Sequence, residues 1–458
     1  MNEKLSKDVS FYGIILAAGI GSRMNSKLSK VFFPFLGKTI LENVIENLKY
    51  INLEGIIIVI SPNDYQKAKY IFGDKVKLVV QDIPLGTADA VRKALPEIKN
   101  ANSNLIILCG DAPLLKTKTI CNLINEFVTN NADAIMLTSI INEPKQYGRI
   151  VRDTNNDFIE IVEYKDSTDE IKKINEINSG TYIFKKNIIE STLDEIDKKN
   201  AANEYYFTDA LRIIKVNKGK IATYCIQGED EIFGINTKKD LTRALKIGYL
   251  NKCLELIEEN GVFVIDPENT YIDRDVSIGR DSIIKPFCVI EGDVEIGEET
   301  SIGPFVSMRG TKGKIIIGNN CLIGPFTSIR EGTIINDEAH LGSYVELKKV
   351  NFGKKSKSMH LTYLGDSEIG ENVNIGAGTI TCNYDGYKKN VTKIEDNVFI
   401  GSDTIIVPPL TIKKGSYTAA GSTITEDVPE NSLGISRAKQ INKENWATKR
   451  RNREGKSG

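Results

Sequence analysis

The sequence predicts an α/β chain in which a helix-covered sheet is followed, after a linker helix, by a parallel β-helix. Two observations predict this fold class. In the first half, short aliphatic runs alternate with amphipathic stretches, a pattern typical of a parallel sheet with helices on both faces. In the second half, an aliphatic residue recurs at every sixth position. A period of six fits neither one helical stripe nor a simple strand, and is typical of a solenoid with flat sides.

The first half has the layout of a Rossmann-like domain. The alternating segments are GIILAA (13–18), FPFLGKTILENVIENLKYI (33–51), GIIIVIS (55–61), PLGTADAVRKALPEI (84–98) and NLIILCGD (104–111). We expect the first, third and fifth to be buried strands and the other two to be helices. Ligands of such sheets bind where the strands end, so we expect the site at those ends.

The loop after the first strand carries glycines and cations. Residues 19–24 read Gly-Ile-Gly-Ser-Arg-Met, and Lys30 follows. Glycines let backbone N–H groups approach phosphates, and Arg23 and Lys30 add positive charge. The loop lacks the third glycine of a dinucleotide fingerprint and the GK[ST] of a P-loop. Taken alone, it is also compatible with an ordinary turn between a strand and a helix.

A carboxylate ends the strand LIILC. Asp111 follows Gly110 at this strand end. An aspartate there suits Mg²⁺, which takes few protein oxygens and completes its shell with phosphates and water. Aspartate after glycine is also a common turn former. Only its combination with the phosphate-type loop favours a metal site.

Residues 237–261 predict a single helix that joins the two halves. Thr237 and Asp240 have the spacing of a capping box, and Asn260-Gly261 forms a natural C-cap. The aliphatic stripe does not last for three heptads, so a coiled coil is not expected.

The sixth-residue ladder organises the second half. It runs through Ile272, Ile278, Ile284, Ile290, Ile296, Ile302 and Met308, then Ile317, Ile323, Ile329, Ile335, Leu341 and Leu347, then Ile369, Ile375 and Thr381, and finally Ile394, Ile400, Ile406, Ile412, Thr418 and Ile424. Three hexads make one triangular coil with the ladder residues inside. We expect a parallel β-helix; the spacing alone does not show its hand, but its similarity to known hexad solenoids implies a left-handed one, against the usual right-handed crossover preference. A β-sandwich does not account for so regular a spacing. The ladder breaks near 309–316, 348–363 and 382–393. We expect ligand sites at these breaks or where two such rods meet.

Composition narrows the possible partners and location. The 458 residues include 60 basic and 61 acidic ones, a net charge of −1. This charge indicates neither nucleic acid nor a membrane surface as a partner. The seven cysteines show no metal-ligand or CxxC spacing, which fits a reducing cytoplasm. The apolar run at 11–19 is better interpreted as the first strand than as a signal peptide, and no run is long enough to span a membrane.

An ordered set of motifs resembles a known family. LAAGIGSRM, SKVFFPFLGK, QDIPLGTADA, LCGDAPLL, YGRIV, IVEYKD, INSGTYIF, NEYYFTDA and FGIN follow the order found in sugar-nucleotide pyrophosphorylases. Together with the hexad rod, HLTYLGD and VNIGAGTITCNYDG, they resemble the bacterial bifunctional uridyltransferase–acetyltransferases. The resemblance implies that acetyl-CoA acetylates glucosamine 1-phosphate. UTP and Mg²⁺ then convert the product to UDP-N-acetylglucosamine and pyrophosphate, for cell-wall synthesis.

The resemblance also implies a division of the chain and a homotrimer in the cytoplasm. Residues 1–236 would form a uridylyltransferase (pyrophosphorylase) domain, 237–261 the linker helix, 262–436 the acetyltransferase β-helix and 437–458 a basic tail. We expect this tail to be mobile beyond about Trp446. The acetyl site of the trimer would use residues of neighbouring chains, with no nucleic acid and no membrane as partner.

For the first domain, the matching positions imply these roles. Arg23 and Lys30 act on the phosphates; Leu16, Ala17, Ala18, Gly19, Gln81, Gly86, Thr87, Cys109, Gly110 and Asp111 bind the nucleotide; Gly148, Glu163 and Asn178 bind the sugar; Asp111 and Asn236 bind Mg²⁺. A sugar 1-phosphate is already anionic at pH 7, so its attack on UTP needs no general base. The sequence departs from the family's common residues at Ile20, Ser22, Ser29, Ala88 and Asp89, and a missing Lys at position 20 lowers the positive charge near the triphosphate.

For the second domain, the same match implies a general base and two binding sets. Arg330, Lys348, Tyr363 and Asn374 bind the amino sugar phosphate; Ala377, Asn383, Tyr384, Lys389, Ser402, Ala420 and Arg437 contact acetyl-CoA. An amine that is protonated at pH 7 must lose a proton before it attacks a thioester, which imidazole can accept. His360 has this role, with Glu346 as a residue that orients it. Met359 departs from a frequent glycine.

Two rival functions stay open on the sequence alone. One is a pyrophosphorylase with a single activity, such as an adenylyltransferase for glucose 1-phosphate, whose β-helix regulates or oligomerises. His360 and the NYDG at 383–386 argue against it. The other is a sugar-nucleotide-sensing scaffold, for which we would expect Asp111 or Arg23 to be lost.

Overall fold

The computed structural model describes residues 9–19 and 21–454. The departure noted at Ile20 therefore lies outside the described residues. The chain divides into two compact units, with the boundary between Gly248 and Tyr249. Each unit is described by itself below.

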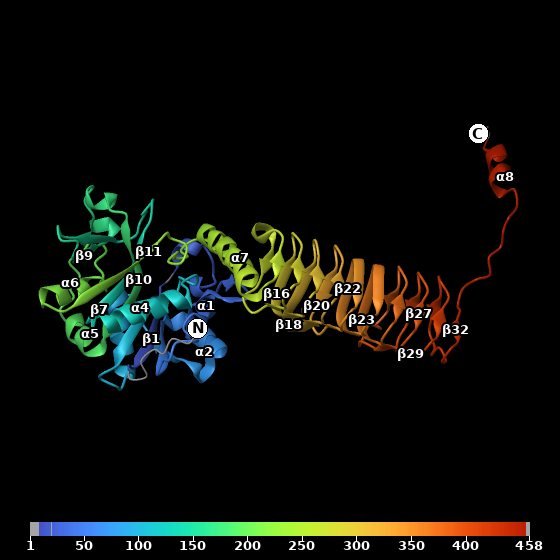
Figure 1. Cartoon of the computed structure of the whole chain (residues 1–458), viewed down its shortest axis with the longest axis horizontal. Coiled ribbons are helices and arrows are strands. Elements are labelled where there is room, and N and C mark those ends of the chain that lie inside the picture. Colours follow the sequence, from blue (N-terminus) through green and yellow to red (C-terminus); the bar gives the residue numbers. More distant parts are fainter. Residues whose placement is uncertain (1–8, 20, 455–458) are drawn as a thin grey trace. The chain divides into compact units, whose positions relative to one another are not determined.

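A mixed sheet forms the centre of the first unit (Figure 1). Its main strand order is β11-β7-β10-β6-β1-β4-β5, and β8 and β9 extend from β10. The strands are β1 Phe11–Ala17, β4 Gly55–Ile60, β5 Lys77–Val80, β6 Asn104–Cys109, β7 Ala134–Ile140, β8 Arg149–Arg152, β9 Phe158–Val162, β10 Glu176–Lys185 and β11 Ile221–Gln227. The predicted strands at 13–18, 55–61 and 104–109 are confirmed as β1, β4 and β6, which are parallel. The sheet is mixed rather than parallel throughout, because β10 runs antiparallel to β6, β7 and β8, and β8 runs antiparallel to β9.

Helices cover both faces of this sheet. They are α1 Ile40–Glu46, α2 Tyr65–Phe72, α3 Thr87–Ala94, α4 Thr117–Thr129, α5 Lys186–Leu193 and α6 Asp209–Val216. Side chains of α1, α2 and α4 share one buried core with the sheet, and those of α3, α5 and α6 share the other. Ile14 and Ile15 of β1 point into opposite cores, because successive side chains of a strand alternate.

The helix predicted at 33–51 is shorter than expected. Residues 34–39 form a two-stranded ribbon of β2 (Pro34–Phe35) and β3 (Lys38–Thr39). Gly37, with φ of 82°, turns this ribbon. The helix α1 begins only after Thr39, whose hydroxyl accepts a hydrogen bond from the Glu42 N–H while the Glu42 carboxylate accepts one from the Thr39 N–H. This capping box fixes the start of the helix.

The linker helix is present as α7, Lys238–Asn260, and the predicted capping box is confirmed at its start. The Asp240 N–H donates to Thr237 Oγ1 (3.1 Å), and the Thr237 N–H donates to Asp240 Oδ2 (2.8 Å). Gly248 stands within this helix where space is short, because a Cβ there would lie 2.9 Å from Leu36 Cδ1. In the second unit, Cys253 and Leu256 of α7 belong to the β-helix core.

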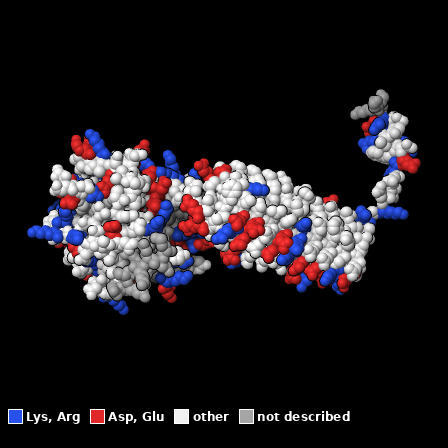
Figure 2. Space-filling view, in the orientation of Figure 1, with Lys and Arg blue, Asp and Glu red and all other residues white. Residues whose placement is uncertain are grey.

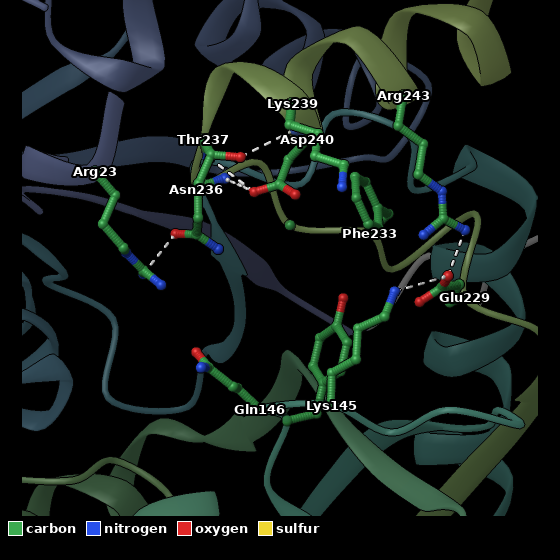
Figure 3. A pocket seen from close by; sticks show the side chains of 12 residues that line it. Arg23, Lys145, Gln146, Glu229, Phe233, Asn236, Thr237, Lys239, Asp240 and Arg243 are labelled. Atoms are coloured by element: carbon green, nitrogen blue, oxygen red, sulfur yellow. Dashed lines mark hydrogen bonds and ion pairs between the residues drawn. The ribbon is translucent and has the colours of Figure 1, made fainter. Parts of the chain in front are cut away.

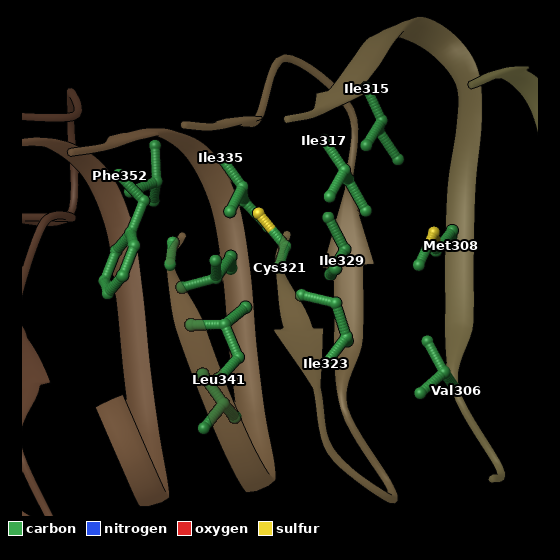
Figure 4. Close-up of a cluster of buried hydrophobic side chains, with 14 of the residues drawn as sticks. Val306, Met308, Ile315, Ile317, Cys321, Ile323, Ile329, Ile335, Leu341 and Phe352 are labelled. Atoms are coloured by element: carbon green, nitrogen blue, oxygen red, sulfur yellow. The ribbon is translucent and has the colours of Figure 1, made fainter. Parts of the chain in front are cut away.

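The second unit is a parallel β-helix of short stacked strands (Figure 1). They are β12 Phe263–Val264, β13 Tyr271–Ile272, β14 Ser277–Ile278, β15 Ile283–Ile284, β16 Val289–Ile296, β17 Ser301–Ile302, β18 Ser307–Ile317, β19 Leu322–Ile323, β20 Ser328–Arg330, β21 Ile334–Ile335, β22 His340–Phe352, β23 Lys357–Ile369, β24 Asn374–Ile375, β25 Ile380–Thr381, β26 Thr392–Ile394, β27 Phe399–Ile400, β28 Ile405–Ile406, β29 Leu410–Ile412, β30 Tyr417–Thr418, β31 Thr423–Ile424 and β32 Leu433–Gly434. Every residue of the predicted ladder is buried. Figure 4 shows several of them, with Met308, Ile329 and Leu341 pointing into the interior.

One of the three predicted breaks is wrong. Between Leu347 and Ile369 the ladder continues through Phe352, Ser358 and Leu364, which are buried and pair with ladder residues of the neighbouring coils. The steps from Leu347 to Phe352 and from Leu364 to Ile369 are five residues long, so the phase shifts twice. A bulky phenylalanine and a polar serine inside the core further obscured the repeat.

The other two breaks are local extensions. β18 runs through 309–316 with a register shift opposite Gly292, and Tyr384 and Lys389 pair across the 382–393 segment. The tail was expected to be mobile beyond about Trp446, but residues Trp446–Arg453 form a short exposed helix, α8. No helix in the described part of the chain is both long and apolar enough to cross a membrane.

Acidic and basic side chains lie side by side on the surface of both units in the view of Figure 2. This mixture is what a net charge of −1 from 60 basic and 61 acidic residues would produce.

Candidate functional site

Four of the predicted site residues meet where β1 and β6 end. The backbones of these adjacent strands approach closely, since the Gly110 N–H donates to the Leu16 carbonyl at 2.9 Å. The Lys30 ammonium lies 2.5 Å from Asp111 Oδ2 and 3.0 Å from Asn236 Oδ1. The Arg23 guanidinium donates to the same Asn236 oxygen at 3.1 Å. Residues far apart in sequence thus share one small network.

This network fits a hard cation. Asp111 Oδ2 and Asn236 Oδ1 are oxygen donors close enough for one ammonium to bridge them. Among the described residues no group of three or more His, Cys, Asp or Glu could hold a metal ion. One carboxylate and one amide are too few for a metal held by protein alone. They are appropriate for Mg²⁺, which binds one or two protein oxygens together with substrate phosphates and water.

A cavity of about 700 Å³ adjoins this network (Figure 3). Arg23 and Asn236 line one side, and Lys145, Tyr147 and Arg243 also line it. Glu229 pairs with both Arg243 and Lys145. Burial raises the pKa of Tyr147 to about 12, so its hydroxyl is neutral at physiological pH, and it accepts a hydrogen bond from the Gly234 N–H. Glu229 and Arg243 were not predicted, because no sequence motif marks a pair between a residue before α7 and one inside it.

Gln81, Gly86 and Thr87 form a second group, at the end of β5. The Gln81 side-chain amide donates to the Gly86 carbonyl at 3.1 Å and to Asp89 Oδ2 at 2.8 Å. A Cβ at Gly86 would lie 2.5 Å from the Tyr205 carbonyl oxygen, so this glycine is required for the close approach of two loops. The departure at Asp89 has a structural role: its carboxylate orients Gln81.

The residues assigned to sugar binding surround the start of β10. Asn178 Nδ2 donates to Tyr182 Oη at 2.7 Å, and the Asn178 N–H donates to the Gly148 carbonyl at 2.9 Å. Burial raises the pKa of the Glu163 carboxyl, which accepts a hydrogen bond from Thr208 Oγ1. Burial also raises the pKa of the Cys109 thiol to about 12, so Cys109 is not a thiolate nucleophile at neutral pH.

In the second unit, four predicted residues stack along one corner of the β-helix. Ser358, Ile375, Ile400 and Thr418 are register partners on consecutive coils. Two residues after each of them come His360, Ala377, Ser402 and Ala420. Backbone hydrogen bonds join these corners, from the Gly378 N–H to the Leu361 carbonyl (2.9 Å), the Asp403 N–H to the Ala377 carbonyl (2.7 Å) and the Gly421 N–H to the Ser402 carbonyl (2.8 Å). We call this stack the His360 corner.

His360 is exposed and lies inside β23, in register with Ser343. The expectation that it lies in a break of the ladder is therefore wrong, although it is outside the core as predicted. Glu346 makes its ion pair with Arg330 (3.3 Å), and Lys348 pairs with Glu331 (3.6 Å). Glu346 is in register with Tyr363, not with His360. The predicted contact between Glu346 and His360 thus remains a prediction.

A second set of predicted residues meets over Gly365. A Cβ there would lie 2.5 Å from Tyr363 Oη and 2.6 Å from Asn383 Nδ2, so both side chains cover this glycine. Asp366, which the sequence analysis did not single out, accepts a hydrogen bond from Asn383 Nδ2 at 2.5 Å and pairs with Lys389 at 3.8 Å. It ties the 382–393 segment to β23. Asn374, at the start of β24, pairs with Phe399, and Arg437 lies in the exposed tail.

The fold and these two sites define a nucleotidyltransferase joined to a hexapeptide-repeat acyltransferase. Family models agree: residues 12–231 match "Nucleotidyl transferase", 275–310 and 314–349 match "Bacterial transferase hexapeptide (six repeats)", and 391–426 match "Hexapeptide repeat of succinyl-transferase".

Whole-chain relatives identify the family. The chain is 45% identical to a Bifunctional protein GlmU of Thermosipho melanesiensis, over 95% of this chain and 97% of the relative. It is 42% identical to one of Geobacillus sp. strain WCH70, over 96% and 98%, and 39% identical to one of Acetivibrio thermocellus, over 95% and 97%. The chain belongs to the family of bifunctional GlmU proteins. It is a bifunctional enzyme with uridylyltransferase and acetyltransferase activities.

Proposed function

We propose that Asp111 and Asn236 bind Mg²⁺ while the first unit transfers UMP from UTP to N-acetylglucosamine 1-phosphate. The network in which Lys30 bridges both residues carries this proposal, because it already holds a cation on their oxygens. When bound, Mg²⁺ would neutralise charge on the phosphates of the nucleotide. Leu16 to Gly19, Gln81, Gly86, Thr87, Cys109 and Gly110 would bind the nucleotide, and Gly148, Glu163 and Asn178 the sugar.

The side chains of this site would align and neutralise the reactants. The acceptor phosphate is an anion at pH 7 and attacks the α-phosphorus without a general base. Arg23 and Lys30 would stabilise the charge that gathers on the departing pyrophosphate. Both cations already lie beside Asn236, at the place where the phosphates would bind.

In the second unit, we propose that His360 removes a proton from the amine of glucosamine 1-phosphate as the amine attacks acetyl-CoA. The geometry of the His360 corner supports this role. Ala377, Ser402 and Ala420 present small side chains directly along the stack from His360, which leaves room for a long, flat ligand. Arg330, Lys348, Tyr363 and Asn374 would bind the amino sugar phosphate, and Asn383, Tyr384, Lys389 and Arg437 the coenzyme.

We further propose a cytoplasmic homotrimer. Four half-exposed rings, Phe287, Phe305, Phe326 and Tyr344, stack at 4.9 to 5.0 Å on consecutive coils. This aromatic stripe favours burial against another subunit. It follows the same corner as His360, because Tyr344 comes directly after Ser343, the register partner of His360. A neighbouring chain on the stripe would therefore reach the acetyl site.

One assay tests the proposed chemistry. Purified protein would receive acetyl-CoA, glucosamine 1-phosphate, UTP and Mg²⁺, and UDP-N-acetylglucosamine would be measured by chromatography. We expect product with Mg²⁺ and none with excess chelator, while N-acetylglucosamine 1-phosphate still forms in the chelated sample. Equal yields of UDP-N-acetylglucosamine with and without chelator would contradict the proposed role of Mg²⁺.

A further inference from the structure

The Asp240 carboxylate holds the backbone on either side of the Asn236 side chain. It is not one of the two proposed metal ligands. Asp240 Oδ2 accepts hydrogen bonds from the Asn236 N–H at 3.1 Å and from the Thr237 N–H at 2.8 Å. Figure 3 shows this carboxylate beside the two residues, while the Asn236 amide points toward Arg23. A charged acceptor makes stronger hydrogen bonds than a neutral one, and these two donors belong to the two peptide units that flank the Asn236 Cα.

The opposite side of the same segment is anchored to the other proposed metal ligand. The Ile235 N–H donates to the Asp111 carbonyl at 2.9 Å. Asn236 therefore lies between two anchors, the main chain of Asp111 and the side chain of Asp240. These two anchors fix the backbone from which the Asn236 side chain extends, and the amide oxygen itself accepts hydrogen bonds from Arg23 and Lys30.

We propose that Asp240 is a positioning residue that holds the Asn236 amide oxygen at the cation site and so sets the affinity of the first unit for a divalent cation. This inference rests on the proposed role of Asn236 in Mg²⁺ binding. Partners that orient metal ligands without touching the metal change metal affinity by about 10- to 100-fold when they are removed.

Helix capping alone is a simpler explanation for Asp240, and the chain contains a control for it. The carboxylate of Glu42 accepts a hydrogen bond from the Thr39 N–H at 2.7 Å, in a capping box of the same design at the start of α1. We have assigned no residue of that helix to a binding site. Loss of either cap should lower the unfolding temperature by a similar amount, but only Asp240 holds a proposed ligand.

The test compares Asp240→Ala, Asp240→Asn and Glu42→Ala in the full chain. Mn²⁺ serves as a spectroscopic probe, and its binding in the presence of UDP-N-acetylglucosamine is measured by water-proton relaxation. We expect Asp240→Ala to weaken Mn²⁺ binding by about 10- to 100-fold. Asp240→Asn should recover part of this loss because its amide oxygen still accepts a hydrogen bond. Glu42→Ala should lower the unfolding temperature to a similar extent and bind Mn²⁺ like the wild type.

Uridylyl transfer provides the second readout. The Mg²⁺ concentration for half-maximal rate should rise in Asp240→Ala, and saturating Mg²⁺ should restore most of the rate. Equal Mn²⁺ affinity in Asp240→Ala and Glu42→Ala would overturn the positioning role. If instead Asn236→Ala binds Mn²⁺ as tightly as the wild type, the proposed metal site itself is wrong, and the inference falls with it.

Discussion

Lys30 Nζ lies 2.5 Å from Asp111 Oδ2, so an ammonium is already bound to the oxygen that we assign to a metal ion. Both side chains are largely shielded from solvent, with exposed fractions of 11% for Lys30 and 22% for Asp111. A nucleotide triphosphate offers this ammonium a competing anion. Transfer of the Lys30 contact from carboxylate to phosphate would leave Asp111 available to a divalent cation.

Asp111→Asn should lower the rate of uridylyl transfer by at least about 100-fold. Loss of a residue that binds the metal directly should lower the rate more than loss of a residue that only orients such a ligand. The rate is measured with supplied N-acetylglucosamine 1-phosphate and UTP. Acetyl transfer by the same sample should stay within about twofold of the wild type, since its residues lie in the other unit. Unchanged uridylyl transfer would refute the metal assignment.

His360→Ala should lower acetyl transfer by at least about 10²-fold, the usual scale for loss of a general base. The pH profile of acetyl transfer should differ between the wild type and the variant, because only the wild type has a side chain that takes the proton from the amine. Higher pH should partly rescue the variant, because the substrate amine then loses its proton unaided. If the two pH profiles superimpose, on samples of equal oligomeric state, a general-base role is excluded.

A charged residue on the aromatic stripe should break up the proposed trimer. Phe305→Asp combined with Phe326→Asp should shift the mass measured by light scattering from about three times 50.8 kDa toward 50.8 kDa and reduce acetyl transfer with it. Uridylyl transfer should be retained. Ile334→Asp provides the control, because Ile334 is similarly exposed but lies on another side of the β-helix, in register with Asn351. An unchanged mass in the double variant would argue against contact along the stripe.

Asp273→Asn should stabilise the second unit at neutral pH. The pKa of Asp273 is raised to about 6, mainly by burial, and the nearby Glu291 and Asp275 contribute to this rise. The pKa of Asp273 is higher in the folded than in the unfolded state. The contribution of this carboxyl group to the free energy of unfolding is therefore fully present below about pH 4 and is lost as the pH rises through about 6. One unit of pKa is about 1.4 kcal/mol, and allowing for residual solvent contact we expect a gain of about 1–2 kcal/mol at about pH 7.5.

Thermal unfolding of wild type and Asp273→Asn at about pH 4.5 and about pH 7.5 checks this sign. The side-chain amide introduced by this substitution can still accept, through its oxygen, the hydrogen bond that the Gly292 N–H donates to Asp273 Oδ2 at 2.8 Å. A difference between the two proteins that grows toward low pH would contradict the expected direction.

The sequence predicted the β-helix well because its core has one simple rule. A buried aliphatic every six residues gave the position of nearly every ladder residue before the structure was known. The rule failed at Phe352, Ser358 and Leu364, where two five-residue steps shift the phase. Five-residue steps of this kind cannot be recognised from the amino-acid composition of the segment. They appear only when strands are paired in register.

Residues that act through other residues were the hardest to predict. Asp111 was identified from its place at a strand end and Asn236 from the family resemblance, and the structure brings both to one ammonium. Asp240 was recognised only as a helix cap, since its bond to the Asn236 N–H depends on the path of the chain before α7. Asp366 was missed because its partners, Asn383 and Lys389, belong to a segment that returns to β23 after an extra loop.

The coils of the β-helix differ in length, and this difference suggests how such a fold can acquire new binding residues during evolution. The coil from Ile369 to Ile394 is longer than three hexads, and its surplus residues form the loop that holds Asn383, Tyr384 and Lys389. In a stack, each layer contacts only the layers above and below. An insertion at one corner therefore leaves the neighbouring layers in register. New binding residues can therefore arise in a corner loop while the buried core stays unchanged. One inherited β-helix can in this way adapt to different acceptors through changes in single loops.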